Sequence, residues 1–458
     1  HKEYRRQRQM CIRDRPGRTA QRPAAPDRLT TNDSSMTHFA VVAPPYYSHF
    51  QALQALAIEL IERGHRVTFF HQSDAAHWLS EPRISFRSVG ANSHPPGSLE
   101  RTLHQAAHPD TPWGLRRIIK QMAGTTAMLC NELPQALADN GIDALLCDQM
   151  EPAGGLVAES LGLPFVSVAC ALPVNREPGL PLPVMPFAYA TDERSQHMYR
   201  GSSQVYDWLM KPLGKVINEA ARRLGVPPRS ALHECLSPLA QISQTLPGFD
   251  FQRSRLPASF HAVGPLRSPL TRKQGEWPID ERRPFFFASL GTLQGDRLKL
   301  FERIAKACKR LDGQLLIAHC GKLDAAQERR LIDCGATWVT DFAPQQWALE
   351  QADAVITHGG LNTVMDAIAA RTPMLVMPIA FDQPGVAARV AYRGVGSQLS
   401  RRASAARIES ALRALLAQPL PGFDALIDEL QQAGGVTRAA DIVEAAVVEH
   451  ATTQAHTL

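Results

Sequence analysis

The 458-residue sequence contains no uninterrupted apolar stretch of the roughly 18–20 residues that would cross a bilayer. It does not open with a secretory signal pattern. Its eight cysteines are scattered and include no C-x-x-C pair. They are therefore expected to be buried thiols in a reducing compartment, not disulfides or a zinc site. From these absences we expect a cytoplasmic protein.

A basic surface is also missing, although the net charge is +5. Residues 1–35 hold nine Lys or Arg and four Asp or Glu, and the rest of the chain holds 40 of each sign. No nucleic-acid partner is expected, because the folded part is neutral. Residues 1–35 are expected to be disordered, or to be upstream sequence translated by mistake, with Met36 as a more natural start.

Two phosphate-binding motifs are absent as well. The chain has no G-x-x-x-x-G-K-[ST], and no G-x-G-x-x-G follows the first strand-like run. Kinase-like and dinucleotide-binding functions therefore lose their main support. No cluster of Asp or Glu predicts a metal site, so we expect neither a metal ion nor a cofactor.

What the sequence does contain is an alternation of short apolar runs and helical patterns, which is typical of βα units and a parallel sheet. The runs form two series: 38–43, 66–70, 144–147 and 165–169, then 285–291, 314–319, 353–358 and 374–378. The charged, Pro-rich segment 265–284 separates them.

We predict an α/β protein with two Rossmann-like, doubly wound parallel-sheet domains that face a cleft. Residues 36–264 form the N-terminal domain, 265–284 the linker and 285–458 the C-terminal domain. Segment 171–190 contains five prolines among apolar residues and cannot be a regular helix. It is either a lid or pocket wall, or a surface connection that merely packs down.

Polar residues follow the apolar runs, at the sheet edge where ligands of parallel sheets bind. His49 follows the first run and could take a proton from a bound hydroxyl; Asp148 ends another and could hold the second ring nitrogen. The alternatives are that His49 only helps to start a helix and that Asp148 only caps one.

In the second series, polar residues likewise follow the apolar runs. Ser289, Gly291 and Thr292 offer small residues and free N–H groups that suit a phosphate. His358 precedes two glycines and a helix start at Asn362 and Thr363, which could bind a second phosphate. Thr363 and Asp366 also match a capping box, and capping alone would explain both. Asp382 and Gln383 together suit sugar hydroxyls.

Residues 342–390, from Phe342 through Pro344-Gln345 and His358-Gly359-Gly360 to Asp382-Gln383, resemble the donor-binding signature of the UDP-glycosyltransferases, which have the GT-B fold. The pattern at 48–70 resembles the N-terminal hallmark of this family. The resemblance extends over about residues 37–450.

The resemblance implies that UDP-glucose is the co-substrate. It assigns Phe342 to stacking on uracil and Gln345 to the nucleoside. Asp366 stands where the family has a ribose-binding Glu that is one methylene longer. The implied diphosphate ligands are Thr292, His358, Asn362 and Thr363. The implied hexose ligands are Asp382 and Gln383, and the Gln favours glucose.

The resemblance further implies an inverting transfer with His49 as base and Asp148 as its partner. Around residues 37–57 the chain resembles family members that glucosylate the carotenoid zeaxanthin. The residues themselves support only an apolar acceptor, since 171–190 and 206–214 are rich in Pro, Leu, Met and aromatics. A macrolide, flavonoid or sterol acceptor, a UDP-sugar epimerase and a binding module that has lost its catalytic pair are the alternatives. Because zeaxanthin dissolves in lipid, transient membrane contact by the N-terminal domain is expected.

Overall fold

The computed structural model describes residues 36–109, 111–268 and 274–456. The predictions for residues 1–35 lie outside this range. From Thr37 onward the described residues belong to one compact unit. None of the helices described here combines the length and the apolar character that a membrane span needs.

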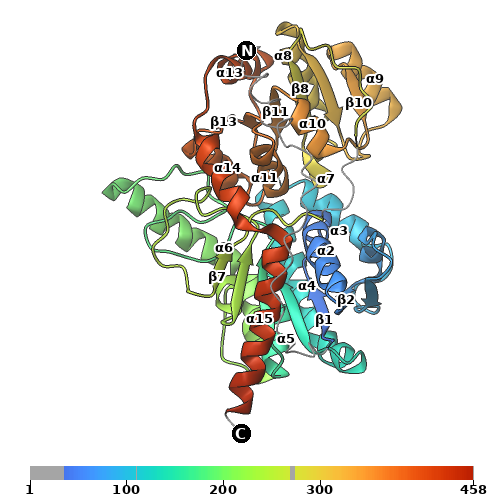
Figure 1. Cartoon of the computed structure of the whole chain (residues 1–458), viewed down its shortest axis with the longest axis vertical. Helices are drawn as coiled ribbons and strands as arrows, with labels where there is room; N and C mark the ends of the chain where they lie inside the picture. Colours follow the sequence, from blue (N-terminus) through green and yellow to red (C-terminus); the bar gives the residue numbers. More distant parts are fainter. Residues whose placement is uncertain (1–35, 110, 269–273, 457–458) are drawn as a thin grey trace, which may run out of the picture. The chain divides into compact units, whose positions relative to one another are not determined.

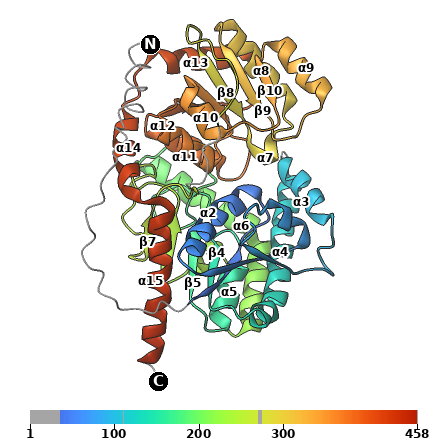
Figure 2. The same cartoon turned by 45° about the vertical axis from the view of Figure 1, so that its right-hand side comes forward.

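The first sheet has seven strands in the order β3-β2-β1-β4-β5-β6-β7, and all neighbours are parallel. Its buried strands read as nearly continuous apolar runs because both faces are covered by helices (Figures 1 and 2). The strands are β1 (His38–Val42), β2 (Arg66–His71), β3 (Ser85–Ser88), β4 (Ala144–Asp148), β5 (Phe165–Ala169), β6 (Ala240–Ser243) and β7 (Phe260–Ala262).

The second sheet has six parallel strands in the order β10-β9-β8-β11-β12-β13. Its order matches that of the first six strands of the first sheet. The strands are β8 (Phe285–Ser289), β9 (Gln314–Ala318), β10 (Trp338–Thr340), β11 (Ala354–Thr357), β12 (Met374–Val376) and β13 (Gly396–Gln398). The predicted class of two Rossmann-like, doubly wound domains is confirmed.

The helices of the first half include two long ones. α4 begins after Thr111, whose hydroxyl accepts from Gly114 N–H, and Pro112 stands at its first turn. α6 begins after the Asp192 cap and ends at Gly225, which has a left-handed φ of 73°. The helices are α2 (Tyr47–Glu62), η1 (Ser73–Trp78), α3 (Ser98–Ala107), α4 (Pro112–Asp139), α5 (Ala153–Ser160), α6 (Glu193–Leu224) and η2 (Leu232–Cys235).

The helices around the second sheet are shorter, and several begin at the edge of the sheet where the cavity described below lies. They are α7 (Gly291–Gln294), α8 (Leu298–Arg310), α9 (Ala325–Cys334), α10 (Gln345–Gln351), α11 (Leu361–Ala369), α12 (Gln383–Tyr392), α13 (Ala405–Ala417) and α14 (Gly422–Ala433).

The last helix, α15 (Gly435–Ala455), departs from the predicted boundary at 285–458. Its residues Val436, Ala439 and Val443 are buried in the same apolar core as Phe39 and Leu56 of the first sheet's half (Figure 1). The reason is its apolar stripe, which needs a partner and finds α2. The C-terminal end of the chain thus returns to the N-terminal half.

Candidate active site

A cavity of about 1450 Å³ lies between the two halves. The first half lines it with residues from the ends of β1 and β4, from α4 and α6, and from segment 171–190. The second half lines it with residues that follow β8, β11 and β12. Segment 171–190 contains no helix or strand, and Leu172, Leu182 and Pro183 are among its lining residues. The segment is thus a pocket wall.

The strand order explains why the polar residues that follow the apolar runs meet. In each sheet the chain runs outward from the first strand and then crosses to its other side, so the ends of β1 and β4, and of β8 and β11, lie next to each other. Such switch points are where doubly wound sheets bind ligands. His49 and Asp148 lie at the first, and Thr292 and His358 at the second.

His49 and Asp148 form the pair that the sequence predicted. His49 Nδ1 lies 2.7 Å from Asp148 Oδ2, and the other carboxylate oxygen accepts from Met150 N–H at 2.8 Å. The Asp148 side chain is fully buried, whereas 13% of the His49 side chain is exposed. The bond places the proton on Nδ1 and leaves Nε2 free to act as a base.

Charge around His49 favours its protonated form. Burial by itself would lower the pKa of the imidazole, but the carboxylate of Asp148, helped by Asp382, outweighs burial and raises the pKa above its usual value. The neighbouring Tyr46 ring lies 5.8 Å from the His49 ring, and burial raises the pKa of Tyr46 to about 12. Tyr46 therefore stays a neutral phenol beside His49.

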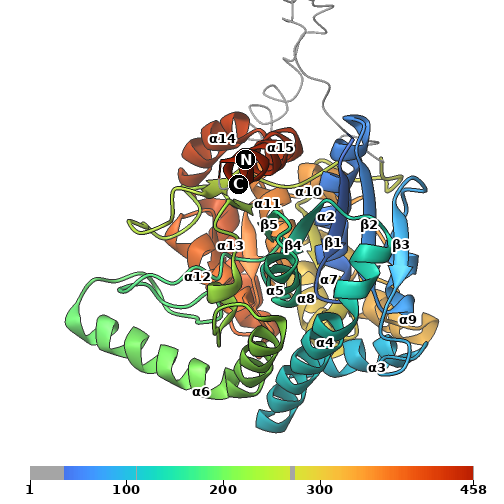
Figure 3. The ribbon, with the colours of Figure 1, turned by 90° about the horizontal axis from the view of Figure 1, so that it is seen from below.

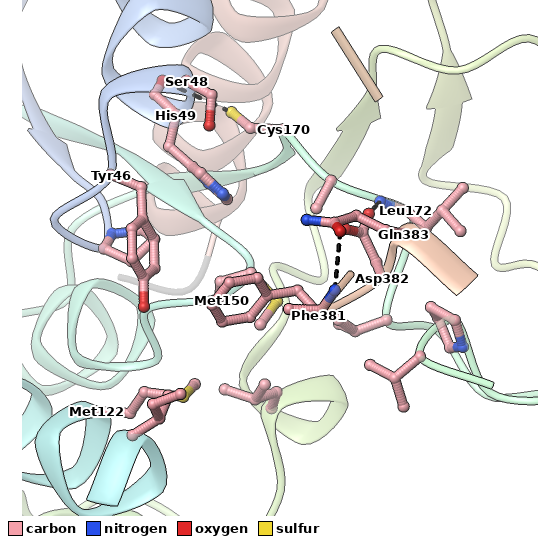
Figure 4. A pocket seen from close by; sticks show the side chains of 18 of the residues that line it. Tyr46, Ser48, His49, Met122, Met150, Cys170, Leu172, Phe381, Asp382 and Gln383 are labelled. Atoms are coloured by element: carbon pink, nitrogen blue, oxygen red, sulfur yellow. Dashed lines mark hydrogen bonds between the residues drawn. The ribbon is translucent and has the colours of Figure 1, made fainter. Parts of the chain in front are cut away.

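Asp382 and Gln383 come from the other half and lie across the cavity from His49 (Figure 4). Desolvation raises the pKa of Asp382, and its Oδ2 accepts from Leu172 N–H at 3.1 Å. The Gln383 side-chain oxygen accepts from the N–H groups of Ile379 and Ala380 at 2.9 and 2.8 Å. Its amide NH₂ therefore remains available as a donor to a ligand.

The backbone at the second switch point approaches the cavity closely. Gly291 has φ 75°, and a Cβ on it or on Gly360 would lie 2.7 Å from the His358 ring. Gly291 and Gly360 thus make room for the His358 ring. Burial lowers the pKa of His358 to about 4, so its imidazole is neutral and can donate one N–H. Thr292, at the second residue of the short helix α7, also lines the cavity.

The start of α11 is tied to the first half. Asn362 Oδ1 accepts from Gln244 Nε2 at 2.7 Å, and its Nδ2 donates to the Ser48 carbonyl at 3.2 Å. Ser48 adjoins His49, so these bonds connect the predicted phosphate site directly to the helix that carries the base.

Thr363, Gln345 and Asp366 form a second group. The Thr363 hydroxyl donates to Gln345 Oε1 at 3.2 Å, and Gln345 Nε2 donates to Asp366 Oδ2 at 2.7 Å. The capping box predicted for Thr363 and Asp366 is absent, since Gly360 is the N-cap of α11 and makes no side-chain cap. Phe342 lines the same end of the cavity and is 66% exposed, which leaves its ring face free to stack.

Two groups of described residues bring three metal-ligand types together: His49, Asp148 and Cys170, and His319, Glu328 and Asp341. In the first group burial raises the pKa of the Cys170 thiol well above its usual value, so it is not a thiolate. In the second group His319 Nδ1 accepts from Lys322 and Leu323 N–H, so Nε2 carries the proton that faces Glu328. In both groups the histidine is already hydrogen-bonded to a carboxylate, His49 to Asp148 and His319 to Glu328.

The structure also reveals residues that the sequence patterns did not indicate. Tyr46 and Phe381 line the cavity with ring centroids 5.9 Å apart, and Phe381 holds a left-handed φ of 57° directly before Asp382. Arg267 and Gln244 bind the predicted donor residues from the first half. Tyr46 and Phe381 lie beside the predicted His49 and Asp382 in the chain, whereas only the packing of the two halves brings Arg267 and Gln244 to their partners.

Comparison with known proteins agrees with this geometry. Residues 285–421 match the family model described as UDP-glucoronosyl and UDP-glucosyl transferase. The chain is 53% identical to zeaxanthin glucosyltransferase of Pantoea ananas over 89% of its own length and 96% of that protein. It is 48% identical to the zeaxanthin glucosyltransferase of Pseudescherichia vulneris over 90% of its own length and 98% of that protein.

Among solved structures, the calicheamicin glycosyltransferase CalG4 aligns with a TM-score of 0.72 at 21% identity, covering 90% of this chain and 98% of that one. The kitacinnamycin glycosyltransferase aligns with a TM-score of 0.71 at 22% identity, covering 90% and 99%. At such identities the likeness concerns the fold, and it confirms the predicted GT-B architecture.

Proposed function

The chain belongs to the UDP-glucuronosyl and UDP-glucosyl transferase family, and we propose that it transfers glucose from UDP-glucose to the terminal hydroxyls of zeaxanthin. One observation supports the proposed reaction. The His49–Asp148 pair, bonded at 2.7 Å, faces Asp382 and Gln383 across a single cavity. The choice of acceptor is supported by the names of the two relatives at 53% and 48% identity.

The proposed reaction is one inverting displacement. His49 Nε2 takes the proton of the acceptor hydroxyl while that oxygen attacks the anomeric carbon of glucose. The bond from that carbon to the diphosphate oxygen breaks, and UDP leaves with the electron pair. Asp148 stabilises the imidazolium that forms, as a buried carboxylate does for other catalytic histidines.

The donor is proposed to lie along the second half. Phe342 stacks on the uracil, Gln345 and Asp366 contact the nucleoside, and Asp382 and Gln383 hold the hexose hydroxyls. The diphosphate meets the N-terminus of α11 with the side chains of Thr292, His358, Asn362 and Thr363. N–H groups that point at the leaving oxygen stabilise its charge without reorganising, so no metal is required.

The acceptor is proposed to occupy the apolar end of the cavity. Met122 of α4, Met150 after β4 and Leu209, Met210 and Leu213 of α6 line this end. Sulfur-containing and aliphatic side chains suit a long hydrocarbon without selecting its exact shape. A macrolide, flavonoid or sterol is the second candidate class, because such a wall would also accept these molecules.

Transient membrane contact is proposed for the helices beside this end of the cavity. Trp113 and Leu115 of α4 and Val205 and Trp208 of α6 are exposed, at 74%, 38%, 56% and 64%. Figure 3 shows α4 and α6 at the same edge of the ribbon. Exposed tryptophans on both helices, with the basic residues Arg116, Arg117 and Lys120 following Trp113 in α4, suit the headgroup region of an anionic bilayer, from which the acceptor would enter.

The deciding experiment is incubation of the protein with radiolabelled UDP-glucose and zeaxanthin in detergent, followed by chromatography. Labelled mono- and diglucosides are expected, since zeaxanthin has two equivalent hydroxyls. A macrolide and a flavonoid serve as competing acceptors. If either of these is labelled while zeaxanthin is not, the acceptor assignment is wrong.

A further inference from the structure

Arg267 lies in the segment between the two sheets, which the sequence suggested to be a plain linker. Its side chain points to the donor half: Nε donates to Asp366 Oδ1 at 3.0 Å, and Nη2 donates to the Asn362 carbonyl at 3.0 Å. Nη1 donates to the Leu266 carbonyl at 2.9 Å, and Leu266 is fully buried. The guanidinium is therefore held by these three bonds, two of them to α11, and by a longer fourth bond from Nη1 to Gln244 Oε1 at 3.5 Å.

The partner carboxylate is the weak point of the resemblance. Asp366 is one methylene shorter than the Glu that the family has there, and it is 7% exposed. Arg267 holds one carboxylate oxygen, and Gln345 holds the other at 2.7 Å. Each carboxylate oxygen has two lone pairs, so both can still accept a ribose hydroxyl. The two donors orient a short side chain that would otherwise choose among rotamers.

The charge balance of the donor half points the same way. None of the described residues from 285 onward that line the cavity is Lys or Arg, and Asp382 is a carboxylate. The pKa of His358 is lowered to about 4, so it adds no charge at neutral pH. UDP is an anion, and Arg267 is a cation that is bonded to the predicted donor residues Asp366 and Asn362.

We propose that Arg267 is a positioning residue of the donor site, which fixes Asp366 and, through it, the Gln345 amide at the ribose end of the donor. Neither Arg267 nor Asp366 is among the residues that line the cavity, whereas Gln345, which donates to Asp366, and Thr363, which donates to Gln345, do line it. Arg267 therefore acts through Asp366 and Gln345 and does not itself contact UDP. This inference rests on the proposed use of a uridine nucleotide donor. It goes further by naming a residue of the first half as a determinant of ribose recognition.

The test compares the binding of UDP and 2′-deoxy-UDP by isothermal titration calorimetry. The wild-type protein is expected to prefer UDP. Arg267→Met is expected to weaken UDP binding by about 10-fold or more, the effect of losing one charged hydrogen bond, and to bring the ratio of the two affinities towards one. Arg267→Lys keeps the charge but loses the planar guanidinium with its several N–H donors, so an intermediate ratio of the UDP and 2′-deoxy-UDP affinities is expected.

Arg63→Met is the matched control. Arg63 has a similar side-chain exposure, 21% against 25%, and is likewise ion-paired, with Glu444 and Asp441, but it does not line the cavity. The ratio of its affinities for UDP and 2′-deoxy-UDP should equal that of the wild type. If Arg267 had a merely structural role, Arg267→Met would also leave this ratio unchanged.

An unchanged ratio in a folded Arg267→Met protein would overturn the inference. If that variant does not fold, an unchanged ratio in Arg267→Lys has the same force. A wild-type protein that binds UDP but forms no zeaxanthin glucoside overturns only the proposed acceptor, so the two failures are distinguishable.

Discussion

The two halves of the molecule share a strand order but differ in the helices that meet the cavity. In the first half, α4 and α6 have 28 and 32 residues and present apolar side chains to it. In the second half, α11 and α12 have nine and ten residues and present their N-terminal ends. The first half therefore lines the cavity with an apolar surface, and the second half lines it with hydrogen-bond donors at fixed positions.

This difference matches two kinds of ligand. A nucleotide sugar has many polar atoms, which short helices with exposed N–H groups can meet one by one. A hydrocarbon has no such atoms and needs a large apolar wall, which long helices supply. His49, the proposed base, lies where these two environments meet, bonded to the first half and facing Asp382 of the second.

The sharpest way to break the comparison is to remove the base alone. His49→Ala should lower kcat by roughly 10²–10⁴-fold, which is the usual contribution of a general base. UDP affinity, measured by calorimetry, should stay within about two-fold of wild type, since the donor contacts lie in the other half. Full transfer activity in this variant would remove His49 from the mechanism.

The next largest effect is expected on the donor side. Asp382→Ala should lower kcat/KM for UDP-glucose by about 10–100-fold, because a charged hydrogen bond to the hexose is lost. The Kd of UDP, which has no hexose, should change far less. Asp424→Ala is the control, because Asp424 is an exposed, ion-paired carboxylate of the second half that does not line the cavity. Equal losses for UDP and UDP-glucose would contradict the assignment.

The places of the polar residues in the second half could be predicted from the sequence because each follows a strand directly. His358, Asn362 and Thr363 follow one strand, and Asp382 and Gln383 follow the next, so strand periodicity alone brings them to one edge. The fold class was predictable for the same reason. Strands β3, β6, β7, β10 and β13 were missed, because each has only three or four residues and is not fully buried, so they lack a continuous apolar run.

What escaped prediction depends on contacts between distant segments. Arg267 is 99 residues from Asp366 and Gln244 is 118 from Asn362, and no periodic pattern links such positions. The return of α15 to the first sheet is similar, since its apolar stripe shows that it packs but not against which half. The Thr363–Asp366 capping pattern was misleading, because Gln345 and Arg267 occupy Asp366 instead.

The acceptor half is tested by removing exposed aromatics. Trp113→Ser combined with Trp208→Ser should weaken binding to anionic vesicles by roughly 5–30-fold, since each partly buried indole contributes about 1 kcal/mol. Activity on zeaxanthin in vesicles should fall accordingly, while activity in detergent should not. Val448→Ser, at an exposed site on α15, serves as control. Unaltered vesicle binding of the double variant would exclude these helices as the contact surface.

A smaller effect is expected on the pH profile. The neutral form of His49 is the base, and Asp148 raises the pKa of this imidazole, so kcat/KM should fall as the pH drops through a value above the usual pKa of about 6.5. In Asp148→Asn the largest raising influence is gone, and the acid limb should move to lower pH although the maximal rate is reduced. If the acid limb of the pH profile does not move in Asp148→Asn, this limb does not report the titration of His49.

The smallest effect is expected from metal removal, and it tests whether the donor half works by backbone and side-chain donors alone. The leaving diphosphate is proposed to be stabilised by the N-terminus of α11 with His358, Asn362 and Thr363, and hydrogen bonds aimed at a developing charge do not need a cation. EDTA should leave the rate within about two-fold, and added Mg²⁺ should not restore more than that. A loss of more than ten-fold that Mg²⁺ reverses would show that a metal shares the diphosphate, and the comparison would then fail, because the second half would no longer bind its ligand by its own groups.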